Sequence, residues 1–483
     1  MTPLELADVL TGTGGDLRGR LPDATRFPRI ERDARRVTSG DLFIAIRGER
    51  FDGHQFVADA AANGAAAALV GREWAAAQRE APLPLIVVDE PVAALQRLAA
   101  SWRDRLDVTV VGITGSVGKT STKEVVAAVL SERYRTYRSP GNLNNEIGLP
   151  LSLLELDPTT EVAVLEMGGA YASGELALLA SLAKPRIAVV TNIFPVHLER
   201  MGTIEAIAET KAELVDAVPA DGVAVLNGDD PRVLAMAGRC RGKVVTYGLD
   251  AGNDVRATEV VTEALEGTSF WLHLPHEEQV HVKVPLVGGH AVSLALAAIA
   301  VGQALRLHIS EMLVGFNDPS VQVRLLVQPG PRGSRIIDDT YNASTPSALS
   351  ALGLLESLHP RRAIAVLGDM RELGSIAEEE HRVVGRRAGE VADLIVTYGD
   401  LARLIGEEAR GVPGRVDGQP PDVTSFALDE RGELVDFLLG ELRDGDVVLL
   451  KGSRGLRMEE MVVALRADAG GAVEESPSAG ASS

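Results

Sequence analysis

Short runs of β-branched residues alternate along most of this chain with longer segments of helical pattern. The run DVTVVGITG at residues 107–115, for example, precedes the helical segment TKEVVAAVLSERY at residues 122–134. Such alternation is typical of α/β domains with parallel sheets. A chain of 483 residues has room for about three domains of roughly 150 residues each. We therefore predict an α/β protein with three sheet-containing domains.

The grouping of the expected strands predicts where these domains lie. We place a first domain at residues 1–104, a central domain at 105–315 and a C-terminal domain at 316–466. The expected strands are residues 42–46, 67–70, 84–89, 162–167, 186–193, 223–227, 336–339, 363–369, 394–399 and 447–453. An Ala-rich helix is expected at 290–305. Residues 467–483 lack apolar periodicity and predict a disordered tail.

The charge balance excludes some classes of partner. The net charge of −20 argues against nucleic acid or an anionic membrane as the main partner. Aromatic residues make up only 4%, which argues against binding by stacking on rows of aromatic side chains. Small anionic ligands remain compatible with this composition, because backbone N–H groups and metals can reverse the field inside one cleft.

The expected compartment is the cytoplasm. Cys240 is the one cysteine, so no disulfide can form within the chain, which indicates a reducing environment. The start MTPLELADVL is acidic where a secretion signal is basic. The longest weakly polar stretch, residues 291–302, is shorter than the ~20 apolar residues that span a bilayer. We expect a soluble protein, monomeric and without membrane insertion.

Residues 112–121, GITGSVGKTS, have the composition and context of a phosphate-binding loop. They lie between a strand and a helix, so glycine N–H groups and the helix N-terminus can converge on phosphate oxygens. Lys119 can reach the terminal phosphates of a nucleotide, and Thr120 can bind Mg²⁺. The usual spacing G-x4-G-K would place glycine where this chain has Ile113. A glycine-rich turn that binds nothing is the alternative, but the Lys-Thr pair and the following helix favour nucleotide. The predicted ATP-binding residues here are Gly115, Ser116, Val117, Gly118, Lys119, Thr120 and Ser121.

Two further polar residues follow expected buried strands. Glu166 ends the run VAVLE, and His197 follows RIAVVTNI. Ligands of α/β sheets bind at the carboxyl ends of the strands, so both side chains could face the same site. Position alone leaves open that Glu166 is a solvated strand end and that His197 is structural.

A series of stretches along nearly the whole chain resembles the Mur ligases. They are DARRVTSGDLFIAIRGERFDGHQF, TGSVGKTSTKEVV, GNLNNEIGLPLSLL, LEMG, TNIFPVHLERMG, ETKAEL, IIDDTYNAS, LGDMRELG and KGSRGLRMEEMV. The resemblance implies a first domain that holds a UDP-sugar and a central P-loop-type ATPase domain with a mostly parallel sheet. It also implies a C-terminal, Rossmann-like ligase domain that closes over the nucleotide.

The resemblance also implies a reaction. ATP would phosphorylate the peptide carboxylate of a UDP-N-acetylmuramoyl-tripeptide, and the amine of D-alanyl-D-alanine would attack the acyl phosphate. This is an ATP- and Mg²⁺-dependent peptide ligation in peptidoglycan precursor synthesis. Two anions must approach each other, so neutralising their charge is the main task of the site.

The resemblance assigns catalytic and metal-binding roles by motif. Lys119 is similar to the phosphate-binding lysine, and Thr120, Glu166 and His197 to metal ligands. Lys211, in ETKAEL, is similar to a lysine that becomes a carbamate and then holds Mg²⁺, although its helix alone would suit a surface lysine. Arg324 is similar to an arginine that reaches the phosphates, with an exposed strand-edge arginine as the alternative.

Further residues are expected to bind nucleotide or substrate. Asp339 and Tyr341 are similar to nucleotide contacts. The expected substrate-binding residues are Arg35, Asp52, His54, Asn142, Asn144, Asn145, Asn342, Lys451 and Arg454. The alternatives are tight turns for the asparagines and strand-end caps for the two cations.

The chain departs from the family pattern at several positions. Ala291 and Leu294 replace two asparagines, which predicts looser recognition of the adenine base. Ala34 replaces a Ser or Thr, and the loop that carries Tyr171 is longer by one residue. Three competing functions remain open: another amide ligase of the same fold, a nucleotide-binding switch protein and a structural scaffold. The sequence does not distinguish diaminopimelate from lysine as the third residue of the peptide.

Overall fold

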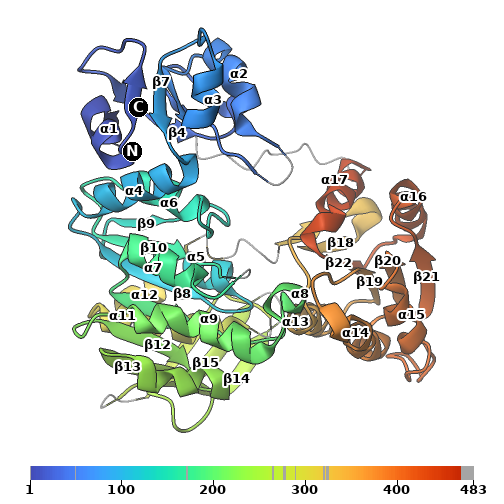
Figure 1. The fold of residues 1–483 in the computed structure, drawn as a ribbon. Coiled ribbons are helices and arrows are strands. Elements are labelled where there is room, and N and C mark those ends of the chain that lie inside the picture. Colours follow the sequence, from blue (N-terminus) through green and yellow to red (C-terminus); the bar gives the residue numbers. More distant parts are fainter. Residues whose placement is uncertain are drawn as a thin grey trace.

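The computed structural model describes residues 2–48, 51–169, 172–263, 266–275, 279–288, 290–318, 321 and 326–468. These residues form three α/β domains with mostly parallel sheets, which confirms the predicted fold class. In Figure 1 the first domain lies at the top, the middle domain below it and the third domain at the right. Of the predicted tail, residues 469–483 lie outside the described residues.

The first domain is built on a five-stranded sheet in the order β2-β7-β6-β5-β4. Strand β2 is antiparallel to β7, and the other pairs are parallel. A separate antiparallel pair, β1 and β3, lies beside it. The elements are β1 (Leu4–Glu5), α1 (Leu6–Thr13), β2 (Asp16–Arg18), β3 (Arg26–Phe27), β4 (Ile30–Glu31), β5 (Leu42–Ile44), α2 (Val57–Ala62), β6 (Ala67–Gly71), α3 (Arg72–Ala77), β7 (Leu85–Val88) and α4 (Pro91–Arg103).

The middle domain contains a nine-stranded sheet in the order β16-β15-β14-β13-β12-β11-β8-β10-β9. Pairing is parallel from β9 to β14, and β14, β15 and β16 extend the sheet as antiparallel strands. The strands are β8 (Thr109–Thr114), β9 (Thr136–Arg138), β10 (Val162–Glu166), β11 (Ile187–Val190), β12 (Val223–Asn227), β13 (Lys243–Gly248), β14 (Val255–Glu263), β15 (Gly267–His273) and β16 (Val280–Val284). The helices are α5 (Lys119–Ser131), α6 (Gly148–Leu154), α7 (Glu175–Ala183), α8 (Leu198–Met201), α9 (Ile204–Asp216), α10 (Pro231–Leu234), α11 (Ala291–Ala304) and α12 (Ile309–Gly315).

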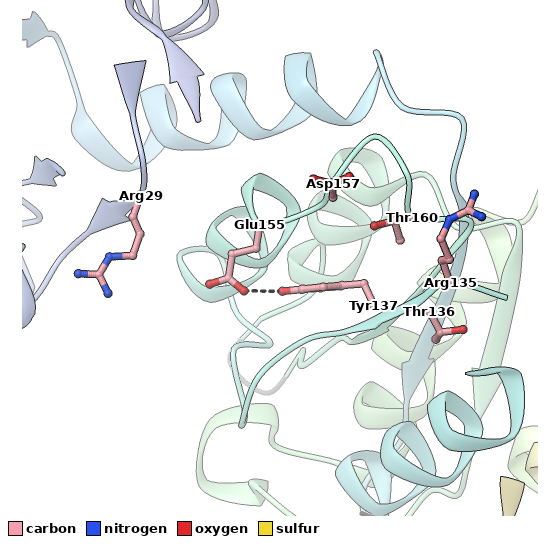
Figure 2. Close-up of a pocket in the computed structure, with 7 residues that line it drawn as sticks. All are labelled: Arg29, Arg135, Thr136, Tyr137, Glu155, Asp157 and Thr160. Atoms are coloured by element: carbon pink, nitrogen blue, oxygen red, sulfur yellow. Dashed lines mark hydrogen bonds between the residues drawn. The ribbon is translucent and has the colours of Figure 1, made fainter. Parts of the chain in front are cut away.

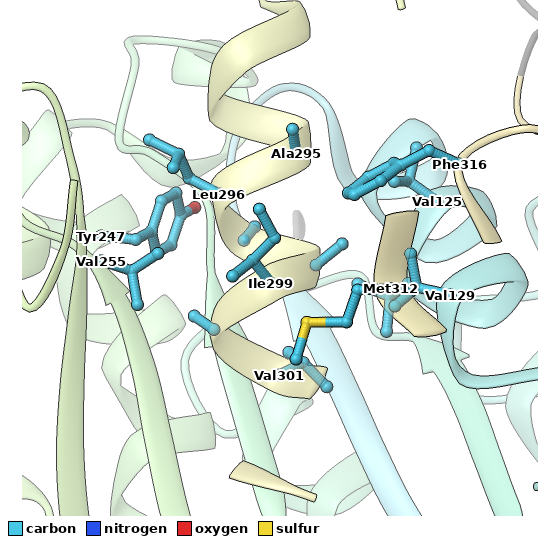
Figure 3. Packing of buried hydrophobic residues seen from close by; sticks show 14 of the residues in the cluster. Val125, Val129, Tyr247, Val255, Ala295, Leu296, Ile299, Val301, Met312 and Phe316 are labelled. Carbon is cyan, nitrogen blue, oxygen red and sulfur yellow. The ribbon is translucent and has the colours of Figure 1, made fainter. Parts of the chain in front are cut away.

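Helix α11 lies in the core of the middle domain. Figure 3 shows its Ala, Leu and Ile side chains between Tyr247 and Val255 on one side and α5 and α12 on the other. A helix that is apolar on most faces is stable only when it is surrounded by protein. The Ala-rich pattern predicted this helix, and the structure adds that it is buried.

The third domain has a six-stranded sheet in the order β17-β18-β22-β19-β20-β21, parallel except for β17. Its elements are β17 (Leu326–Pro329), β18 (Arg335–Asp339), α13 (Thr345–Ser357), β19 (Arg362–Gly368), α14 (Ala377–Val391), β20 (Leu394–Tyr398), α15 (Arg403–Ala409), β21 (Asp422–Phe426), α16 (Arg431–Glu441), β22 (Asp446–Lys451) and α17 (Glu459–Asp468). The expected strands in this domain and in the first two lie within three residues of the observed ends.

The first and middle domains share one hydrophobic core. Leu95 and Leu98 of α4 belong to the same cluster as Leu42 of the first sheet and Leu153 of α6. The indole Nε1 of Trp102 also donates a hydrogen bond of 3.1 Å to the carbonyl of Leu156. Because apolar side chains of both domains pack together, this junction is a continuous interior; the predicted bounds near 104 and 315 stay predictions.

In the part of the chain that the structure describes, contacts between the middle and third domains involve the segment before α11 and the short helix α8. Val287 packs against the core of the third domain. Burial lowers the pKa of the His290 imidazole, and the nearby charge of Lys451 lowers it further. None of the described helices is both long and apolar enough to cross a bilayer.

Candidate active site

The phosphate loop occupies the turn between β8 and α5. Gly115 has φ of 141° and Gly118 has φ of 83°, values that favour glycine, and α5 begins directly at Lys119. The Nζ of Lys119 donates hydrogen bonds to the carbonyls of Gly115 and Ser116 at 2.8 and 3.1 Å. The ammonium group thus lies over the loop, where the predicted phosphate would bind.

A second loop, after β11, holds the phosphate loop in shape. Asn192 accepts a hydrogen bond of 2.8 Å from the N–H of Val117 and donates one of 3.0 Å to its carbonyl. The hydroxyl of Thr191 donates to the same carbonyl at 2.8 Å. The side chain of Ser116 in turn exchanges hydrogen bonds with the backbone of Phe194. Sequence reasoning missed Thr191 and Asn192, although the motif TNIF follows a strand that pairs directly with β8.

Glu166 is buried at the end of β10 and contacts two predicted site residues. Its carboxylate accepts hydrogen bonds of 2.6 Å from the hydroxyl of Thr120 and from the amide of Asn144. Its side chain is only 2% exposed, so the solvated strand end is the wrong alternative. The structure therefore brings Thr120, Asn144 and Glu166 together beside the phosphate loop.

Lys211 lies on α9 and is 4% exposed, so the surface-helix alternative is wrong. Its Nζ donates hydrogen bonds to the carbonyls of Gly168 and Gly169, at 2.8 and 2.5 Å. Burial, reinforced by the nearby charge of Lys119, lowers the pKa of the amine to about 7. Burial therefore favours the neutral form of the Lys211 amine.

His197 comes from the loop between β11 and α8 and has a left-handed backbone, with φ of 58°. Burial lowers the pKa of its imidazole, the carboxylate of Glu372 acts in the opposite direction, and the charges of Lys119 and Lys211 lower it further. These couplings place His197 at the same edge of the sheet as the two lysines.

Lys123 is a third residue that sequence reasoning missed. It is fully buried on α5, and its Nζ donates to the carbonyls of Ser139 and Gly141 at 2.5 and 2.9 Å. This lysine fastens the loop that carries Asn144 to the helix that starts at the phosphate loop. Its position, four residues after Lys119 on the same helix face, was the available signal.

The predicted residues of the third domain gather at the carboxyl edge of its sheet. The Nζ of Lys451 donates to Asp339 at 2.5 Å and to the carbonyl of Asn342 at 3.0 Å. The guanidinium of Arg454 lies over the ring of Tyr341, 5.4 Å from its centre. Lys451 is buried, so its charge supports Asp339, whereas Tyr341 is 41% exposed at the surface.

The predicted residues of the first domain occupy different environments. Both ring nitrogens of His54 are engaged within the domain, Nδ1 by Asp52 at 2.6 Å and Nε2 by the N–H of Gly71 at 2.9 Å. Arg35, in contrast, has a largely exposed side chain that pairs with Asp33. The geometry leaves Arg35 accessible to a ligand, whereas His54 supports the loop that carries Asp52 and His54 itself.

Asn142 and Asn145 make hydrogen bonds within the segment that carries them. Asn145 accepts a hydrogen bond of 2.8 Å from Gly148 and so supports the start of α6. The carbonyl of Asn142 accepts one from the N–H of Asn144, also at 2.8 Å. Arg324 and Tyr171 lie outside the described residues.

A cavity of about 520 Å³ lies between the first and middle domains, away from these residues (Figure 2). Within it, Tyr137 donates a hydrogen bond of 2.9 Å to Glu155, whose pKa is raised by burial. The lining residues are Arg29, Arg135, Thr136, Tyr137, Glu155, Asp157 and Thr160. Thr136 and Thr160 lie at the amino ends of β9 and β10, opposite to the edge that carries Glu166.

Comparison with known proteins decides the family. The sequence matches models of the "Mur ligase family, catalytic domain" at residues 28–103, the "Mur ligase middle domain" at 113–302 and the "Mur ligase, glutamate ligase domain" at 324–454. A curated relative from Bacillus subtilis, named UDP-N-acetylmuramoyl-tripeptide--D-alanyl-D-alanine ligase, is 37% identical over 95% of this chain and 97% of its own length. This chain belongs to the Mur ligase family.

Solved structures of Mur ligases agree with this assignment. A crystal structure of MurF from Acinetobacter baumannii superposes with a TM-score of 0.83 at 30% identity, over 96% of this chain and 99% of that one. MurF from Thermotoga maritima, solved in complex with ADP, superposes with a TM-score of 0.74 at 29% identity, over 92% and 98%. As a Mur ligase, this chain is an ATP-dependent enzyme that forms an amide bond.

Proposed function

We propose that this Mur ligase joins D-alanyl-D-alanine to the peptide carboxylate of a UDP-N-acetylmuramoyl-tripeptide, in the cytoplasm. Near full-length similarity to relatives named for that reaction carries the proposal. The contact of Thr120 with Glu166 at the phosphate loop supports this proposal. It places a hydroxyl and a carboxylate where a nucleotide would bind beside a second anion.

The reaction proceeds in two steps. A carboxylate oxygen of the peptide attacks the γ-phosphorus of ATP, the bond to the β–γ bridging oxygen breaks, and ADP leaves. The amine nitrogen of the dipeptide then attacks the acyl carbon, the acyl–oxygen bond breaks, and inorganic phosphate leaves with loss of one proton from the nitrogen. Lys119 and the N-terminus of α5 bind the phosphate charge that would otherwise repel the incoming carboxylate.

The residues at the phosphate loop fit one Mg²⁺ ion. Mg²⁺ prefers oxygen ligands and is usually held by one or two carboxylates together with substrate phosphates. Thr120 and Glu166 supply a hydroxyl and a carboxylate within 2.6 Å of each other. When bound, the ion would neutralise charge on the transferring phosphoryl group.

Lys211 fits a metal only after modification. In its amine form it donates hydrogen bonds to two carbonyls, and an ammonium group repels a cation. Its low pKa and burial favour reaction of the neutral amine with CO₂, which would give an anionic carbamate. We propose this carbamate, with His197, as the partner of a second Mg²⁺.

The remaining site roles belong to the same proposal. Asp339, Tyr341 and Arg324 would contact the nucleotide. Arg35 and Asp52 would bind the UDP end, and His54 would support the loop that carries Asp52. Asn144 and Asn342 would orient substrate, and Arg454 is available for the incoming dipeptide. A monomer, with domains at residues 1–104, 105–315 and 316–466, completes the proposal.

Product mass tests the proposed reaction. The enzyme is incubated with UDP-N-acetylmuramoyl-tripeptide, ATP, Mg²⁺ and D-alanyl-D-alanine, and phosphate release is followed in parallel. We expect a product heavier by the dipeptide residue, for both diaminopimelate- and lysine-containing acceptors or for one of them. Lys119→Ala should lower turnover by about 10²–10³-fold, since it removes a cation from the transferring phosphate.

Two outcomes contradict the proposal. Phosphate release that depends on single amino acids and not on the dipeptide would identify a different amide ligase. Slow ATP hydrolysis that is indifferent to the UDP-linked peptide would identify a nucleotide switch.

A further inference from the structure

The third domain places one carboxylate against the histidine that follows β11. The Oε2 atom of Glu372 contacts Nδ1 of His197, across 175 positions of sequence and between two domains. Beside this contact, a Cβ on Gly374 would lie 3.5 Å from the backbone nitrogen of Glu199. The loop 372–374 therefore packs against the first turn of α8, and Figure 1 shows α8 where the middle and third domains approach each other.

Both residues of the contact have an uncommon backbone. His197 has φ of 58° and Glu372 has φ of 66°. Non-glycine residues adopt this left-handed region only where the surrounding structure holds them, and such positions concentrate at functional sites. That two of them meet across one domain interface indicates a built contact, because a chance surface encounter would not require either conformation.

The contact determines which nitrogen of His197 carries a proton. A carboxylate can only accept at Nδ1, so Nδ1 is the donor and Nε2 keeps its lone pair. This assignment applies to the neutral imidazole, since an imidazolium would carry a proton on both ring nitrogens. An Nδ1–H···carboxylate pair is the arrangement that orients a histidine whose other nitrogen binds a ligand.

We infer that Glu372 is a positioning residue for the ligation. It holds His197 in the Nδ1–H tautomer, with Nε2 available at the edge of the middle sheet that carries the phosphate loop. Because Glu372 belongs to the third domain, this positioning exists only while that domain is docked on α8. The inference rests on the proposed function for what His197 acts on, but not for its tautomer.

Nuclear magnetic resonance of the full-length enzyme tests the tautomer directly. Histidine is labelled with ¹⁵N, and His197 is assigned by the signal that disappears in His197→Asn. We expect Nδ1 of His197 to be protonated in the wild type. Glu372→Ala should shift the population toward the Nε2–H form, whereas Glu372→Gln should retain the Nδ1–H form because its amide oxygen still accepts. Glu378→Gln, an exposed carboxylate on α14, is the matched control and should change nothing.

Two results would overturn the inference. One is an Nε2–H tautomer of His197 in the wild type; the other is an identical tautomer in the wild type and in Glu372→Ala. Turnover provides a second readout. We expect Glu372→Ala to lower kcat by about 10–100-fold with little change in KM for ATP. The double variant with His197→Asn should be no slower than His197→Asn alone, and multiplicative effects would contradict the coupling. If His197→Asn leaves turnover intact while the tautomer result holds, the proposed role of His197 fails and the positioning stands.

Discussion

Gly115 lies so close to Thr191 that a Cβ at this position would be 2.0 Å from the threonine hydroxyl oxygen. The phosphate loop and the loop after β11 therefore form one packed unit. At Gly118, by contrast, a Cβ would meet nothing within 4 Å. The two glycines differ in packing while both have positive φ, so they form a matched pair for substitution.

Gly115→Ala should destabilise the enzyme by about 2–4 kcal/mol, because overpacking adds to backbone strain. Gly118→Ala carries only the strain and should cost about 1–2 kcal/mol. Urea unfolding of both variants measures the difference. Thr191→Ala in the Gly115→Ala background should recover part of the loss; no recovery would show that the hydroxyl is not the obstacle.

Asn192→Asp should weaken ADP binding by about fivefold. The carboxylate cannot donate to the carbonyl of Val117, so the phosphate loop loses one hydrogen bond that fixes its shape, worth about 1 kcal/mol. Isothermal titration with ADP measures the effect. Asn317→Asp, at an exposed position two residues after the end of α12, should leave ADP affinity unchanged, and equal weakening in both variants would argue against a specific clamp.

Lys211 should make stability depend on pH. The amine has a pKa of about 7 in the folded enzyme against 10.5 for the ordinary group, so between these values the unfolded chain binds more protons. The free energy of unfolding should therefore rise with pH from about 7 to 10.5 in CO₂-free buffer. Below this window Lys211 is protonated in both states, so its destabilising effect is constant and adds no pH dependence. Lys211→Met should flatten that rise, and Lys243→Met, on an exposed site of β13, should not. A wild-type slope in Lys211→Met would show that another group is responsible.

Arg35 and His54 should respond differently to replacement. His54→Ala should lower the free energy of unfolding by about 1–3 kcal/mol, because Asp52 and the N–H of Gly71 lose their partner. Arg35→Ala, at an exposed position, should leave stability unchanged and raise KM for the UDP-linked substrate. A raised KM with intact stability in His54→Ala would instead make His54 a direct substrate ligand.

The pattern of apolar and polar residues predicted most strands of the parallel sheets. It predicted fewer of the residues that form the candidate active site. Runs such as Val223–Asn227 are buried on both faces, so their apolar continuity marks them as strands. The antiparallel strands β14 to β16 were not anticipated, since Glu259 and other polar residues interrupt the run. Residues at the sheet edge that carries the phosphate loop could be predicted where they lie at the end of an expected strand, as Glu166 does. The partners of the supporting residues Asn192, Lys123 and Glu372 could not be predicted, because they are distant in sequence and are brought near only by the folded chain.

The common interior of the first and middle domains has a consequence for substrate selection. Since α4 packs into the hydrophobic core that the two domains share, the site proposed for the UDP group and the phosphate loop should stay at a constant separation. Under the proposed function, the enzyme would then select peptides by length. A peptide that is too short would leave its carboxylate out of reach of ATP, and one that is too long would place the carboxylate beyond ATP. Chain length, and not only side-chain identity, would decide which precursor is extended.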